Sequence, residues 1–144
     1  LGRLSEVRKV DAAIDDALGL LGFSQWADRR VKTLSKGMRQ RVGVAQAILH
    51  KPKILFLDEP TSGLDPEGTA EIRDILLRIN AELGTTIFMN THMLSEATRT
   101  CSDIGIINHG KLLLADTLKN IEKQYEDCKS LEEIYFRIGK GAAK

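Results

Sequence analysis

One stretch of the sequence, residues 54–65, constrains the fold more than any other. It runs Ile-Leu-Phe-Leu-Asp-Glu-Pro-Thr-Ser-Gly-Leu-Asp, so an apolar run leads directly into two carboxylates and a proline. An unbroken apolar run of this kind predicts a strand buried on both faces, as in a parallel sheet. Pro60 ends the strand, because proline donates no ladder hydrogen bond. Asp58 and Glu59 are therefore expected at the carboxyl end of an inner strand, where open α/β sheets bind ligands.

Two adjacent carboxylates at such an edge can divide the work of phosphoryl transfer between them. One can hold Mg²⁺, which prefers oxygen ligands and is usually bound through one or two carboxylates plus substrate phosphates. The other can orient or deprotonate a water for attack on phosphorus. The alternative is a solvated Asp-Glu pair that caps the turn after the strand.

Hydrophobic periodicity predicts helices and strands in alternation around this stretch. The expected elements are a helix capped by Ser5 and closed by Gly22, a helix capped by Ser35 and stopped by Pro52, a helix from Asp65 to Gly84, a second buried strand at 85–89, a short helix at 94–100, a hairpin turn at 108–110, and helices at 118–126 and 131–138. A strand-helix-strand unit of these lengths predicts a right-handed crossover. If the two strands are parallel, His92 follows the second one at the same edge as Asp58 and Glu59.

The helix that begins at Ser35 has a start suited to an anion. Ser35 is a good N-cap residue, and Gly37 lies in the first turn after it. The unpaired N–H groups and the positive end of the helix dipole favour a phosphate at this position. The alternative is an ordinary capped helix.

Composition excludes several classes of function. A net charge of +1 gives no strong field for nucleic acid or acidic lipid. The two cysteines, Cys101 and Cys128, form no C-x-x-C pair and are expected to be reduced thiols in a cytoplasmic protein. No apolar run reaches the length of about 18 residues that a membrane span requires.

Four ordered segments together resemble the ATP-binding-cassette (ABC) ATPases. The run Leu34-Ser35-Lys36-Gly37-Met38-Arg39-Gln40-Arg41 resembles their signature motif, and Ile54 to Glu59 resembles the Walker B strand with its catalytic glutamate. Ser62-Gly63-Leu64-Asp65 is similar to the D-loop, and His92 is similar to the switch histidine. The resemblance covers Thr33 to about Ala115 strongly and the flanking helices more loosely.

The resemblance implies a role for each matching residue. Asp58 would hold Mg²⁺, Glu59 would polarise the attacking water, and His92 would contact the γ-phosphate. Asp65 would couple two subunits across a dimer. The nucleotide-binding residues at the signature, which would act on ATP bound to the partner subunit, are Ser35, Lys36, Gly37 and Met38.

The sequence departs from the family pattern in two ways. Lys36 and Met38 stand where glycine and glutamine are commonest. No G-x-x-x-x-G-K-[ST] phosphate loop occurs in the sequence, and no candidate for the family's glutamine loop precedes the opening helix. The chain is therefore expected to be the C-terminal part of a nucleotide-binding subunit, with little ATPase activity alone and with unpaired apolar strand edges that favour oligomerisation.

The fold class expected from this resemblance is α/β, a partial P-loop NTPase core with a mostly parallel sheet and a helical signature subdomain. The expected domains are a helical subdomain at 1–52, the later half of the ATPase core at 53–116 and C-terminal helices at 117–144. The expected function is ATP hydrolysis that powers a membrane transporter, with ATP and Mg²⁺ as cofactors. The expected partners are a second nucleotide-binding subunit and a transmembrane permease that holds the protein at the cytoplasmic face, with no nucleic acid. Two alternatives are a non-transport ABC protein of the translation or DNA-repair type and a non-catalytic dimerisation module.

Overall fold

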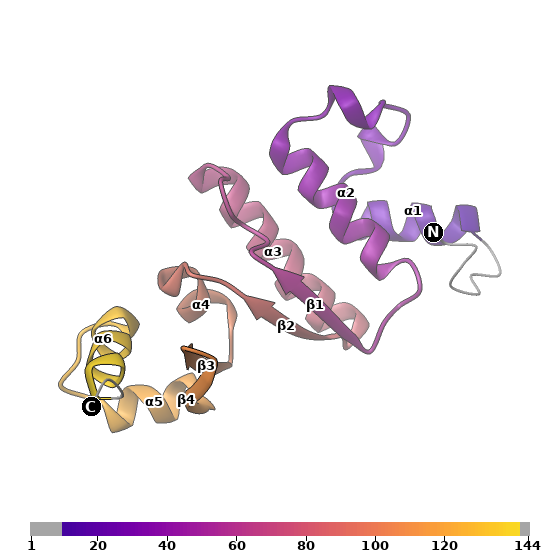
Figure 1. Ribbon diagram of the computed structural model, residues 1–144. Coiled ribbons are helices and arrows are strands. Elements are labelled where there is room, and N and C mark those ends of the chain that lie inside the picture. The colour runs from indigo at the N-terminus through magenta and orange to yellow at the C-terminus, as the bar shows by residue number, and fades with distance from the viewer. Residues whose placement is uncertain (1–9, 142–144) are drawn as a thin grey trace. The chain divides into compact units, whose positions relative to one another are not determined.

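The computed structural model describes residues 10–141 (Figure 1). The chain divides into two compact units between Asn90 and Thr91. The first unit contains α1 (Val10–Leu20), the 3-10 helices η2 (Ser24–Trp26) and η3 (Val31–Thr33), α2 (Lys36–Ile48), β1 (Ile54–Asp58), α3 (Pro66–Leu83) and β2 (Thr86–Asn90). The second unit contains α4 (Leu94–Thr100), β3 (Asp103–Asn108), β4 (Lys111–Thr117), α5 (Leu118–Gln124) and α6 (Leu131–Gly141). The predicted domain boundaries, between residues 52 and 53 and between residues 116 and 117, remain predictions.

The first unit is built on a parallel pair of strands joined by α3, as the strand-helix-strand pattern predicts. β1 pairs with β2 in register from Ile54 opposite Thr86 to Asp58 opposite Asn90. Both arrows point the same way in Figure 1, with α3 running alongside them. β2 begins at Thr86, one residue later than expected. Thr85, just before it, is fully buried, and its hydroxyl donates to the Pro52 carbonyl at 2.8 Å.

The predicted helix caps at three positions are confirmed. The Ser35 hydroxyl accepts a hydrogen bond from the Met38 amide at 3.2 Å, and the Asp65 carboxylate accepts one from the Gly68 amide at 3.0 Å. Gly84 ends α3 in the left-handed region with φ of 64°, where a side chain is costly. The proposed cap at Ser5 lies outside the described residues.

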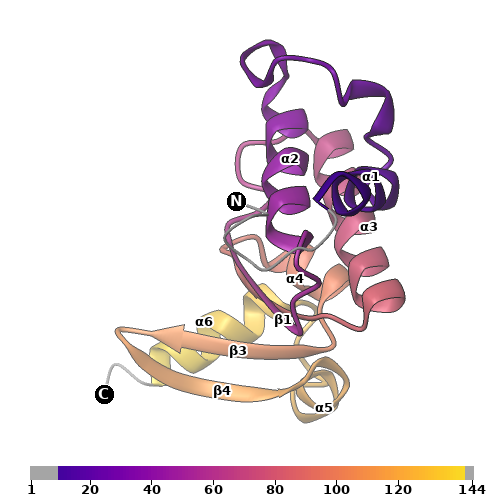
Figure 2. The same cartoon turned by 90° about the vertical axis from the view of Figure 1, so that its right-hand side faces the viewer.

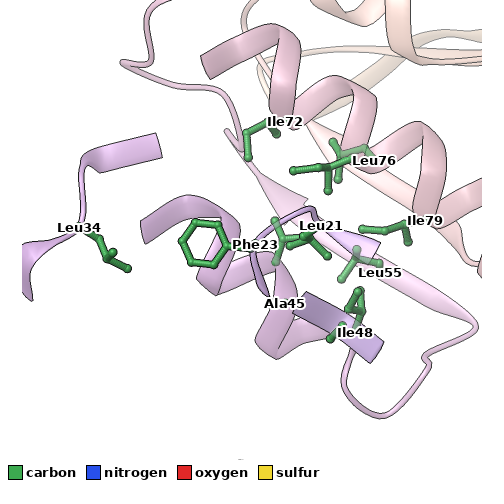
Figure 3. Packing of buried hydrophobic residues seen from close by; sticks show 12 residues of the cluster. Leu21, Phe23, Leu34, Ala45, Ile48, Leu55, Ile72, Leu76 and Ile79 are labelled. Carbon is green, nitrogen blue, oxygen red and sulfur yellow. The ribbon is translucent and has the colours of Figure 1, made fainter. Parts of the chain in front are cut away.

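One apolar core holds the first unit together. The inner face of the sheet, with Leu55 at 5% exposure, packs on the row of α3 residues Ile72, Leu76 and Ile79, none of which exceeds 1% (Figure 3). Leu21 and Phe23, just after α1, fill the same cluster, and α1, α2 and α3 stand together in Figure 2. This packing fixes the position of β1 relative to the start of α2.

The prediction that β1 and β2 are buried on both faces is wrong for this chain. Ile54, Phe56 and Phe88 are 55%, 71% and 64% exposed, whereas Leu55 and Leu57 on the opposite face pack into the core. Side chains alternate along a strand, and in the described part of the chain only one face of the sheet is covered by helices. The rings of Phe56 and Phe88 contact each other on the outer face, with centroids 5.6 Å apart.

The second unit has a smaller core of its own. β3 and β4 form the predicted antiparallel hairpin, with a bulge between Ile106 and Ile107 (Figure 2). Ile106, Ile121 and Ile134 are buried together with Ala97 and Leu131. Arg137 donates two hydrogen bonds to Asp127, which lowers the pKa of that carboxyl.

None of the helices within residues 10–141 combines the length and hydropathy needed to cross a bilayer.

Within residues 10–141, β1 and β2 expose one apolar face, and each has one edge that no other strand pairs with. These features should make this 144-residue chain self-associate. We expect light scattering to give a mass that rises with concentration. The double substitution of Phe56 and Phe88 by Thr should reduce this association with little loss of unfolding free energy, because both rings are exposed. The control is Val31→Thr, at an exposed apolar residue outside the sheet, which should change nothing. A constant monomer mass at all concentrations would contradict the prediction.

Candidate functional site

Asp58 and Glu59 lie where the sequence predicts them, at the carboxyl end of a parallel strand. Asp58 is the last residue of β1 and is exposed on the same face as Phe56. Glu59 is half-buried and has a φ of 48°, in the left-handed region that residues with side chains rarely adopt. Such strain costs about 1–3 kcal/mol and is concentrated at functional sites. The turn at Glu59 is held by hydrogen bonds of its amide to the Asn90 carbonyl and of its carbonyl to the Ser62 amide.

Asn90 is a site residue to which the sequence pattern assigned no role, although it falls at the end of the second predicted strand. Its side-chain amide donates to Asp58 Oδ1 at 2.7 Å, and its carbonyl accepts the Glu59 amide at 2.9 Å. The parallel pairing places Asn90 directly opposite Asp58, because the two strands are in register and end together. Nothing in the pattern of apolar residues fixed that register before the structure.

The start of α2 brings the predicted signature residues against the turn after β1. The added Cβ of an alanine at Gly63 would collide with the Lys36 ammonium, so that group lies directly over Gly63. A Cβ at Gly37 would lie 3.9 Å from the Leu64 side chain. Lys36 and Gly37, at the start of α2, therefore border Gly63 and Leu64 in the turn after β1. The Lys36 contact was not predicted, because it depends on tertiary packing.

Asp65 closes the same turn by capping α3. Its Oδ1 accepts from the Gly68 amide, and a Cβ at Gly68 would lie only 2.8 Å from that oxygen. An ion pair between Arg41 of α2 and Glu71 of α3 links the two helices beyond the turn. The cap is a local role, and the predicted role of Asp65 across a dimer stays a prediction.

His92 follows β2 by two residues and belongs to the second unit. Its side chain is exposed, and the loop around it is shaped by a hydrogen bond from the Met93 amide to the Thr91 hydroxyl at 3.0 Å. Its predicted contact with a γ-phosphate stays a prediction.

The residues present fit a Mg²⁺ ion of the kind bound together with phosphate. Residues 10–141 contain no group of three or more His, Cys, Asp and Glu side chains arranged to hold a metal. Mg²⁺ sites in phosphoryl-transfer proteins use one or two carboxylates plus substrate phosphates, so a single oriented carboxylate is sufficient. Asp58 is exposed and has one oxygen engaged by Asn90. Asp58 is thus the residue that would hold the ion.

The candidate site is an open edge and not an enclosed pocket of the first unit. A pocket of about 550 Å³ lies among α1 and the ends of α2 and α3, and no predicted site residue lines it. Its walls carry opposite charges, including Asp16, Lys51 and Arg78. The edge formed by residues 58–65 and the start of α2 is therefore separate from this pocket.

Comparison with known proteins assigns the family. Residues 3–62 match the family model described as ABC transporter, a segment that includes Ser35, Asp58 and Glu59. The chain is 46% identical over 107 residues to the uncharacterized ABC transporter ATP-binding protein YhcH of Bacillus subtilis (strain 168), which covers 74% of this chain and 35% of that protein. It is 42% identical over 116 residues to the bacitracin transport ATP-binding protein BcrA of Bacillus licheniformis, which covers 78% of this chain and 38% of that protein. The chain belongs to the ABC transporter ATP-binding family.

The fold of this ABC chain agrees with the assignment. It superposes on the solved structure of cbiO1 from Clostridium perfringens, part of the ABC transporter complex cbiONQ, with a TM-score of 0.74 and 31% identity. That match covers 93% of this chain and 53% of cbiO1. The ABC chain spans 35% and 38% of the lengths of YhcH and BcrA, so it corresponds to only part of such a protein.

The contact between Lys36 and Gly63 predicts an energetic coupling. Gly63→Ala should lower the free energy of unfolding by about 1–2 kcal/mol, because Gly63 has a φ of 66°. The same substitution also displaces the Lys36 ammonium. In a double-mutant cycle with Lys36→Ala, followed by urea unfolding, the two changes should couple by about 0.5 kcal/mol or more.

Gly84 is the matched control for this cycle. It has a φ of 64°, and an added Cβ there meets nothing within 4 Å. Gly84→Ala and Lys36→Ala should be additive within about 0.5 kcal/mol. If Gly63→Ala and Lys36→Ala are also additive within this limit, the contact between Lys36 and Gly63 is contradicted.

Proposed function

We propose that this ABC chain is part of an ATP-hydrolysing subunit that powers transport across a membrane. The proposal is supported by the family assignment and by the bacitracin-transport name of a relative that is 42% identical. The observation that carries it is the placement of Asp58 and Glu59 at the carboxyl end of a parallel strand, with Asp58 oriented by a neighbouring amide.

The roles follow from the chemistry of each group. Asp58 would hold Mg²⁺, which when bound neutralises charge on the phosphates of ATP. Glu59 would orient and polarise the attacking water, since a carboxylate is a suitable general base. His92 would contact the γ-phosphate.

The signature segment would complete the site of a second subunit. Ser35 accepts from the Met38 amide, which leaves its hydroxyl hydrogen available to donate to a phosphate oxygen. The amides of Lys36 and Gly37 precede the first intrahelical bond, from the Arg39 amide to the Ser35 carbonyl, and point out of the helix start. These groups lie on an open edge, which suits a ligand that is enclosed only when a second subunit docks. Asp65 would lie at that subunit boundary.

The partners proposed are therefore a second nucleotide-binding subunit and a transmembrane permease, with the subunit held at the cytoplasmic face of the membrane. No nucleic-acid partner is proposed, since the net charge is +1. The sequence of 144 residues contains no phosphate loop, so the chain by itself should hydrolyse ATP negligibly.

The proposal is tested by Glu59→Gln in the longer subunit that contains this chain, reconstituted with its permease. We expect kcat for ATP hydrolysis to fall by about 10²–10⁴-fold, because the general base is removed, while binding of Mg-ATP persists. Glu122→Gln, an exposed glutamate on α5, is the control and should hydrolyse ATP normally.

Two outcomes would contradict the proposal. An unchanged kcat for ATP hydrolysis in the Glu59→Gln subunit would show that Glu59 is not the general base. Turnover by the isolated 144-residue chain that Glu59→Gln abolishes would show that no other segment is needed.

A further inference from the structure

Asn90 touches both of the carboxylate residues of the candidate site. Its side chain donates to Asp58 Oδ1 at 2.7 Å, and its main-chain carbonyl accepts from the Glu59 amide at 2.9 Å. It is the last residue of β2 and stands opposite Asp58 in the parallel register. One residue thus contacts the proposed metal ligand through its side chain and the proposed general base through its backbone.

The side-chain hydrogen bond selects one orientation of the Asp58 carboxylate. A hydrogen bond to an ionised acceptor is shorter and stronger than one between neutral groups, in accord with the distance of 2.7 Å. Because the amide holds Oδ1, the carboxylate cannot rotate freely about its terminal bond. Hydrogen bonds of this kind to a metal-binding carboxylate typically alter metal affinity by about 10–100-fold.

The alternative role for Asn90 is purely structural. Asn90 and Asp58 are both exposed at the end of the sheet, where water can satisfy either side chain. A hydrogen bond in such a place contributes little to the stability of the fold. Its main effect is therefore on the direction of the Asp58 carboxylate and not on folding.

We infer that Asn90 is a positioning residue that orients Asp58 for the metal ion of bound Mg-ATP. This inference rests on the function proposed for Asp58. The hydrogen bond from the Glu59 amide to the Asn90 carbonyl does not depend on the side chain at position 90. A substitution of Asn90 therefore isolates the effect of its side chain on Asp58.

The test measures metal binding directly, with Mn²⁺ as a spectroscopic substitute for Mg²⁺. The longer subunit that contains this chain is titrated with Mn²⁺ in the presence of ATP, and bound Mn²⁺ is counted by electron paramagnetic resonance. Binding of ATP in the presence of a chelator is measured alongside. Asn90→Ala should weaken Mn²⁺ binding by about 10-fold, with metal-free ATP binding and the midpoint of urea unfolding unchanged.

Asn120→Ala is a matched control. Asn120 also donates to an exposed aspartate, Asp116, at 2.7 Å, but on α5 in the second unit. This variant should bind Mn²⁺ like the parent protein. Asp58→Asn serves as the reference for loss of the metal ligand itself.

The outcomes separate this inference from the proposed function. If Asp58→Asn loses Mn²⁺ and Asn90→Ala binds it like the parent, the inference about Asn90 is wrong and the function of Asp58 stands. If Asp58→Asn also binds Mn²⁺ normally, the function proposed for Asp58 fails and the inference fails with it. An Asn90→Ala variant that loses metal-free ATP binding or unfolds earlier shows a structural role, which also overturns the inference.

Discussion

The parallel register of β1 and β2 is the constraint on which the rest of the candidate site depends. Because Asp58 stands opposite Asn90, both strands end at the same level, and the hydrogen bonds that continue the pairing reach the side chain of Asp58 and the amide of Glu59. The chain then turns sharply at Glu59 and enters residues 60–65. A register shifted by one residue would move Asp58 to the other face of the sheet and remove its partner.

The core of the first unit holds the signature segment in place relative to these strands. α3 is nearly inaccessible along its row of isoleucine and leucine residues and packs under the inner face of the strands. The start of α2 is then held against the turn after β1 by Lys36 over Gly63 and by Gly37 beside Leu64. The outer face, with Phe56 and Phe88, carries no such cover in the described residues, although its side chains are as apolar as those inside.

The sequence predicted the elements well where one local rule decides the structure. The strand at 54–58, the cap residues Ser35 and Asp65 and the end of α3 at Gly84 all follow from residue type and position. The sequence did not predict features that depend on distant neighbours. The orientation of Asp58 by Asn90 needs the register, the exposure of Phe56 needs knowledge of what covers the sheet, and the contact of Lys36 needs the packing of two helices. The strain at Glu59 has no signal in the residue type at all.

The most direct measurement of the central claim is a crystal structure of the longer subunit with Mg-ATP, trapped by Glu59→Gln. We expect the metal to lie at the carboxyl end of β1, with Asp58 as the nearest carboxylate, and the signature segment of a second copy to contact the γ-phosphate. A metal held by other residues, with Asp58 directed into solvent, would contradict it.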